Sequence, residues 1–141
     1  MNPREEELKK ATTLLEEGRH EKCLEVLRQC WLKNPEDAKT VELLSRLMKD
    51  ADQEELSNSL KALSGNKTAS GQDEHLDLEK EPEKVFEAGY KLIDIREFEL
   101  AEMLLKKASA MAPDDPTVHY ELGFAMMSQA NLLSNAAALA R

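Results

Sequence analysis

The feature of this sequence that most constrains its fold is an internal repetition. When the 141-residue chain is shifted against itself, residues 18–37 align with residues 96–115. Repetition at a fixed spacing predicts a protein built from stacked copies of one small unit. The residues that meet are similar in size or shape at five places: His20 with Phe98, Cys23 with Ala101, Leu27 with Leu105, Cys30 with Ala108 and Pro35 with Pro113.

Helix starts occur at matching places along the chain. Proline in a first turn loses no hydrogen bond that the helix needs, and nearby carboxylates complement the helix dipole. Four prolines stand near acidic residues and ahead of an apolar pattern of helical period: Pro3, Pro35, Pro82 and Pro113. Only four Val and two Ile are present, so β-branched residues are scarce and strands are not expected. The sequence predicts an all-α fold with helices at 3–17, 20–33, 38–50, 53–63, 82–95, 98–111, 116–129 and 132–140.

One segment interrupts the period. Pro35 and Pro82 lie farther apart than the other neighbours in this series of prolines, and the interval between them contains residues 64–81, which are rich in Ser, Gly, Asp and Glu. This composition is typical of a linker. We therefore divide the chain into two helix pairs at 1–63, an acidic flexible linker or insertion at 64–81, and one further pair plus an incomplete unit at 82–141.

The repeated unit resembles that of the tetratricopeptide repeat (TPR) family, in which a pair of antiparallel helices recurs about every 34 residues. Residues 82–115 carry the fullest match, residues 4–37 and 116–141 match in part, and residues 38–63 match weakly. The matching positions of the fullest unit are Ala88, Gly89, Leu92, Phe98, Ala101, Leu105, Ala108 and Pro113. The resemblance implies a right-handed α-solenoid of about four units, the second degenerate and the last incomplete, and a role in binding other proteins.

The charge of the chain argues against several classes of partner. Acidic side chains outnumber basic ones by 28 to 19, which gives a formal net charge of −9 and repels nucleic-acid phosphates and anionic lipids. No apolar run approaches the roughly 20 residues of a membrane-spanning helix, and the N-terminus lacks the apolar core of a signal peptide. We expect a cytoplasmic protein whose partner is a protein or peptide, with no nucleic acid and no membrane.

Two of the predicted helices carry apolar side chains on two faces. The face predicted to pack inside the repeat holds Val85, Ala88, Gly89 and Leu92 in one helix, and Leu122, Gly123 and Met126 in the other. A second face, with residues at i, i+4 and i+7, forms what we call the aromatic strip: Phe86, Tyr90, Ile93, Tyr120, Phe124 and Met127. Either the strip binds a partner helix or extended segment, or the chain's own linker or C-terminal helix covers it.

Residues 18–30 bring one His and both Cys close together in the sequence, as a metal or redox site would. In a helix, however, Cys23 and Cys30 are about 10 Å apart, which exceeds the roughly 7 Å that a disulfide spans between Cα atoms. A zinc site needs about four ligands, and only distant histidines could complete this one. Because Ala is the repeat partner of each Cys, we predict two small packing side chains and no metal site.

No group of residues has the types and spacing that catalysis or cofactor binding requires. We therefore predict no catalytic residue, no cofactor and no enzyme activity. The expected function is that of a non-catalytic adaptor, scaffold or chaperone-like module that binds a polypeptide segment in a concave, partly aromatic groove. The alternative is a structural or assembly fragment of a larger repeat protein, which oligomerises through its apolar helix at 132–140.

Overall fold

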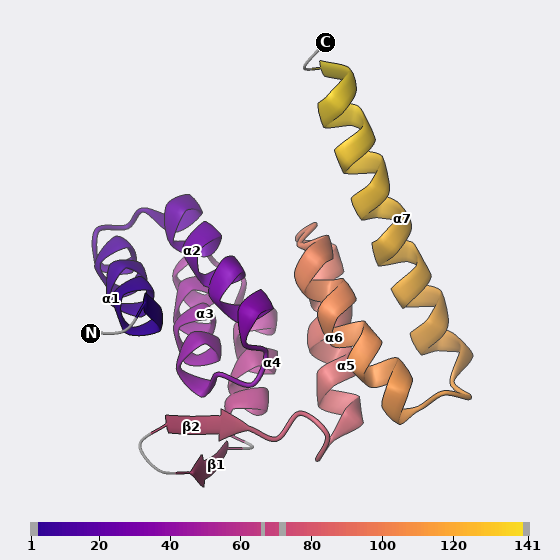
Figure 1. The fold of residues 1–141 in the computed structure, drawn as a ribbon, viewed down its shortest axis with the longest axis horizontal. Coiled ribbons are helices and arrows are strands. Elements are labelled where there is room, and N and C mark those ends of the chain that lie inside the picture. Colours follow the sequence, from indigo (N-terminus) through magenta and orange to yellow (C-terminus); the bar gives the residue numbers. More distant parts are fainter. Residues whose placement is uncertain (1–2, 66, 71–72, 140–141) are drawn as a thin grey trace. The chain divides into compact units, whose positions relative to one another are not determined.

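Figure 1 shows the fold of the chain in a computed structural model that describes residues 3–65, 67–70 and 73–139. Within these residues the protein is all-α apart from one short hairpin, and its seven helices pack mainly against their neighbours in sequence. The chain divides into two compact units, Met1–Lys80 and Glu81–Arg141.

The first unit contains two sequential helix pairs. Its helices are α1 (Pro3–Glu16), α2 (His20–Lys33), α3 (Ala38–Asp50) and α4 (Glu54–Ser64). Helix α3 packs against its own partner α4 and also against α1 and α2. The core between them is rich in leucine and includes the fully buried Trp31, whose Nε1 donates a hydrogen bond to the carbonyl oxygen of Pro35 at 2.9 Å. One pair therefore buries the apolar face of the next, as in repeat proteins.

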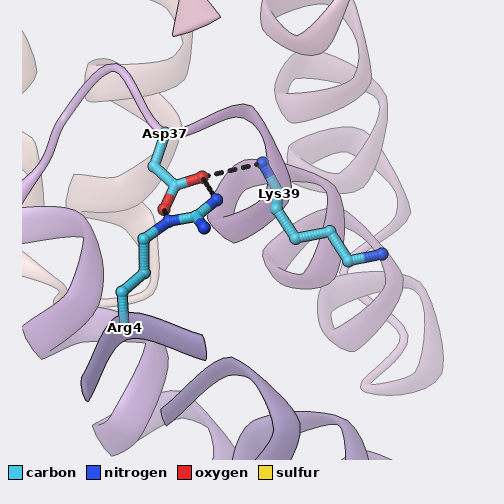
Figure 2. Close-up of polar contacts among 3 residues, drawn as sticks. All are labelled: Arg4, Asp37 and Lys39. Carbon is cyan, nitrogen blue, oxygen red and sulfur yellow. Dashed lines mark hydrogen bonds and ion pairs between the residues drawn. The ribbon is translucent and has the colours of Figure 1, made fainter. Parts of the chain in front are cut away.

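An ion pair fixes the start of α1 to the junction before α3. The guanidinium of Arg4 donates two hydrogen bonds to the Asp37 carboxylate, from Nε at 2.6 Å and from Nη2 at 2.9 Å (Figure 2). Asp37 also caps α3, because its Oδ1 accepts a hydrogen bond from the backbone nitrogen of Lys39 at 3.1 Å. Burial raises the pKa of Asp37, but the hydrogen bonds and charge of Arg4 outweigh it, so the pKa of this carboxyl lies below its ordinary value.

The second unit contains three helices, α5 (Pro82–Asp94), α6 (Phe98–Met111) and α7 (Pro116–Leu139). Helices α5 and α6 form a sequential pair joined by residues 95–97, and α7 packs on α6 and also contacts α5 (Figure 1). Pro82 occupies the first turn of α5, as its position in the sequence predicts. The core of the unit is formed by one face of α5 and by the leucine-rich face of α6 that meets it.

The chain reverses between paired helices at residues with a left-handed backbone. Gly18, Asp52 and Arg96 have φ angles of 74°, 61° and 64°, and each follows the first helix of a pair. Gly18 and Asp52 are one repeat period apart, and Asp52 and Arg96 are separated by one period plus the length of the insertion. Ala130 is the next position in this series, and it lies inside a helix. Alanine has the highest helix propensity of the amino acids, so Ala130 favours continuation of the helix.

The predicted break between helices at 116–129 and 132–140 is therefore wrong. Helix α7 runs without interruption from Pro116 to Leu139. Residues 128–133 contain neither Gly nor Pro, and none of them has a positive φ angle. The described part of the chain thus has seven helices instead of the eight expected, and the second half of α7 extends beyond α5 and α6 (Figure 1).

A short antiparallel hairpin lies in the segment where no strand was expected. Strand β1 (Lys67–Ser70) pairs with β2 (Asp73–Leu76), with Lys67 opposite Leu76. The backbone nitrogen of Leu76 donates a hydrogen bond to Glu36 at 2.7 Å, and Leu76 and Leu78 are buried, so this hairpin belongs to the first unit. Its sequence signal is weak, because the two short runs are polar and a single Ser-Gly pair is the only turn signal in the sequence between them. The boundaries and flexibility of the linker at 64–81 stay predictions.

Candidate functional site

The aromatic strip lies within the second unit, where α5 supplies Phe86, Tyr90 and Ile93 and α7 supplies Tyr120, Phe124 and Met127. These two helices contact each other. Four of the six side chains are exposed: Tyr90 by 46%, Tyr120 by 70%, Phe124 by 46% and Met127 by 70%. Phe86 and Ile93 are half-buried. A contiguous patch of exposed large apolar side chains often marks an interaction site.

Close packing of α5 on α6 determines which face of α5 is exposed. The neighbouring face of α5 is buried as predicted and contains Val85, Ala88, Gly89 and Leu92. A Cβ atom added at Gly89 would lie only 2.9 Å from Cγ of Leu105 on α6. Only a glycine allows this approach without a shift of Leu105. Phe86 and Ile93 lie beside this packing face and are half-buried, whereas Tyr90 is exposed.

The packing face of α7 differs from the prediction. Val118 and Ala125 are buried, whereas Met126 is 45% exposed and Gly123 is half-buried. No atom lies within 4 Å of a Cβ atom added at Gly123. The expected packing role of Gly123 and Met126 is therefore wrong, because the second helix that would have covered them continues α7 instead of folding back.

Two pairs of aromatic rings and two hollows shape the surface of the strip. The rings of Phe86 and Tyr90 have centroids 6.3 Å apart, and Phe124 meets the buried ring of Phe98 edge to face at 6.5 Å. A hollow of about 320 Å³ is lined by Ile93 and Phe124 among others. A second hollow, of about 280 Å³, lies beside Phe86. Both are near the lower end of the size range of ligand pockets, about 300 Å³, and could each accept an apolar side chain of a partner.

Two residues lie near the strip although the sequence pattern did not place them there. Phe98 was assigned to packing alone, yet it supports Phe124 and lines the larger hollow together with Ile93. Leu132 lines the same hollow and was assigned to a separate helix. Leu132 follows Phe124 by eight residues on one continuous helix, so its place beside the strip follows only once the helix is known to be uninterrupted.

The cysteine-containing segment lies on α2, away from the strip in sequence and in the other unit. Cys23 and Cys30 are both free thiols. Cys23 is fully buried, and its Sγ lies 3.3 Å from the carbonyl oxygen of Ala11, to which it donates a hydrogen bond. Burial raises the pKa of both thiols above the ordinary value. They are therefore protonated at neutral pH, which makes them poor nucleophiles and poor metal ligands.

Among the residues that the structure describes, no group of three or more His, Cys, Asp or Glu side chains is placed to hold a metal ion. None of the described helices is long and apolar enough to span a membrane. Comparison of the sequence with models of known protein families finds no match, and comparison with curated proteins finds none either.

Proposed function

We propose that the chain is a TPR-like repeat module without catalytic activity, and that it binds an apolar or amphipathic polypeptide segment across the aromatic strip. The observation that carries this proposal is the exposure of Tyr90, Tyr120, Phe124 and Met127 on two contacting helices. Aromatic and methionine side chains are frequent anchors in protein interfaces. A helix or an extended segment that covered these side chains would remove them from water.

The repeat architecture is supported by the period of the chain reversals. Left-handed residues end the first helix of each pair at Gly18, Asp52 and Arg96, in step with the repetition of the sequence. Each helix also packs mainly on its neighbours in sequence. Both features are expected of an α-solenoid, in which one unit contacts only the units next to it.

The alternative, in which the chain covers its own strip, finds less support. The hairpin in the linker segment packs against α3, a helix of the first unit. The second half of α7 continues straight instead of returning across α5. Within the second unit, the four strip side chains are exposed with α7 in place.

The proposal is tested by selecting binding peptides from a displayed random library on the full chain and measuring their affinity for variants. Tyr90→Glu and Phe124→Glu place a charge where an apolar anchor would be buried, and each should weaken binding about tenfold or more. Leu133→Glu is the matched control, since Leu133 is 64% exposed on α7 but lies outside the strip. Circular dichroism should show equal helicity in all three variants.

Two results would contradict the proposed site. One is a set of selected peptides whose affinity is unchanged by both strip substitutions. The other is an equal loss of affinity in Leu133→Glu, because nonspecific hydrophobic binding to α7 would then explain the result better than binding at the strip.

A further inference from the structure

Helix α7 has an uncharged face that no part of the described chain covers. Residues 122–139 contain no Asp, Glu, Lys or Arg, although these residues make up 33% of the whole chain. Four residues on one side of the helix define what we call the α7 seam: Gly123, Met126, Ala130 and Leu133. Met126 is 45% and Leu133 64% exposed, and Ala130 is also exposed. The α7 seam lies about 100° around the helix from the strip residues of α7.

The spacing within the α7 seam is that of a coiled coil. Gly123 and Ala130 are seven residues apart, as are Met126 and Leu133, and the four positions alternate in steps of three and four. This is the seven-residue period that lets two helices keep one face in contact, and here it extends over residues 123–133. Small residues occupy one position of the repeat and large residues the other.

Comparison of the glycines of α5 and α7 shows that the α7 seam has no described helix packed against it. Gly89 and Gly123 are one repeat period apart. At Gly89 the space beside the helix is filled, since an added Cβ atom would lie 2.9 Å from Leu105 and 3.4 Å from Leu104. A Cβ atom added at Gly123 would have no atom within 4 Å. A position that is suited to close helix packing thus has no helix against it.

We propose that the α7 seam is a dimer interface, which packs antiparallel against the α7 seam of a second copy of the chain. In the register that we propose, Gly123 of each copy faces Leu133 of the other, and Met126 faces Ala130. Both pairs are centred on residue 128, so a single twofold axis generates all four contacts. Every contact joins a small residue to a large one, which is the complementarity that close packing of two helices requires.

Charge favours a second copy as the occupant. Two chains that each carry a net charge of −9 repel each other over most contacts, but an uncharged seam brings no like charges together. An antiparallel arrangement in addition sets the positive end of each helix dipole beside the negative end of its neighbour. The α7 seam is therefore a face on which two copies of this acidic chain can meet without bringing like charges together.

The oligomeric state in solution is the first test. Over a micromolar to millimolar concentration range, light scattering should show the mass rising from that of one chain to that of two chains. Ala130→Glu and Met126→Glu, which each introduce a charge into the seam, should keep the chain monomeric throughout. Ala110→Glu is the matched control, because Ala110 is an exposed alanine on α6. A monomeric native chain, or a dimer that survives both seam substitutions, would overturn the proposal.

The register is tested by disulfide cross-linking between variant chains. Gly123→Cys mixed with Leu133→Cys should give a cross-linked dimer, because these two positions face each other. Either variant alone should not, since like positions are ten residues apart along the helix axis, about 15 Å, and a disulfide spans roughly 7 Å between Cα atoms. Cross-linking of Gly123→Cys with itself would indicate a parallel pair and would also overturn the proposal.

Peptide binding separates this inference from the proposed function. Ala130→Glu should abolish dimerisation and leave the affinity for selected peptides unchanged, because Ala130 lies outside the strip. Tyr90→Glu should weaken peptide binding and leave the mass of the dimer unchanged. Loss of both properties in both variants would mean that the strip and the α7 seam are one surface, against the inference.

Discussion

At the scale of single residues, two glycines in repeat-equivalent positions have opposite surroundings. Gly89 has the side chain of Leu105 against it, whereas Gly123 has open space. The sequence alone assigned both to the packing face, because the repeat aligns them. The difference arises from an element elsewhere, since α6 covers the first glycine and no described element covers the second.

The two glycines should therefore respond to alanine with opposite signs. Gly89→Ala forces a Cβ atom against Leu105, and we expect the free energy of unfolding to fall by about 1–2 kcal/mol after the gain in helix propensity. At a protein concentration low enough to keep the chain monomeric, Gly123→Ala adds only the propensity gain and should raise it by roughly 1 kcal/mol. Denaturant unfolding followed by circular dichroism measures both, and a change of the same sign in the two variants would contradict the packing described for α7.

At the scale of elements, the sequence predicted the first six helices to within one residue at each end. It did so because the apolar period defines each helix, and proline with acidic residues also marks the starts of α1, α3 and α5. The break in α7 was predicted from the repeat alone, and it failed because Ala130 stands where the earlier turns have Gly18, Asp52 or Arg96. The hairpin was missed because its strands are short and polar, and its buried residues, Leu76 and Leu78, lie only at and after the end of β2.

The ion pair that joins α1 to α3 has a predictable dependence on pH. Arg4→Met leaves the Asp37 carboxylate buried without its ionic partner, since Asp37 is only 2% exposed. We expect the first unit to lose about 1–3 kcal/mol of its free energy of unfolding at pH 7. Fluorescence of Trp31, the single tryptophan of the chain, reports on this unit during denaturant unfolding.

The sign of the pH effect follows from the pKa of Asp37. In the native chain this pKa is lowered in the folded state, so Asp37 stabilises the fold above its unfolded pKa, and that contribution is lost as the pH falls through the folded pKa. In Arg4→Met the hydrogen bond from Lys39 remains, but the charge and hydrogen bonds of Arg4 no longer offset burial, so the pKa of Asp37 is higher than in the native chain. The stability difference between native and variant should therefore be largest near pH 7 and shrink as the pH falls through about 4. A difference independent of pH would argue against the ion pair.

At the scale of the whole molecule, the chain consists of two helical units, and the features proposed for function lie in the second. Sequence periodicity alone gave the six strip residues as a set. It could not give their exposure, which depends on whether other parts of the chain cover them. The α7 seam could not be anticipated either, because it exists only if α7 is one uninterrupted helix.

The central claim, that the strip on α5 and α7 binds a polypeptide segment, is tested most directly by nuclear magnetic resonance. A selected peptide would be titrated into the isotope-labelled full chain, and the shifted resonances would be assigned to residues. We predict that the largest shifts fall on Tyr90, Tyr120 and Phe124 and on their neighbours, while the first unit is unaffected. Shifts concentrated in the first unit, or spread evenly over both units, would contradict the claim.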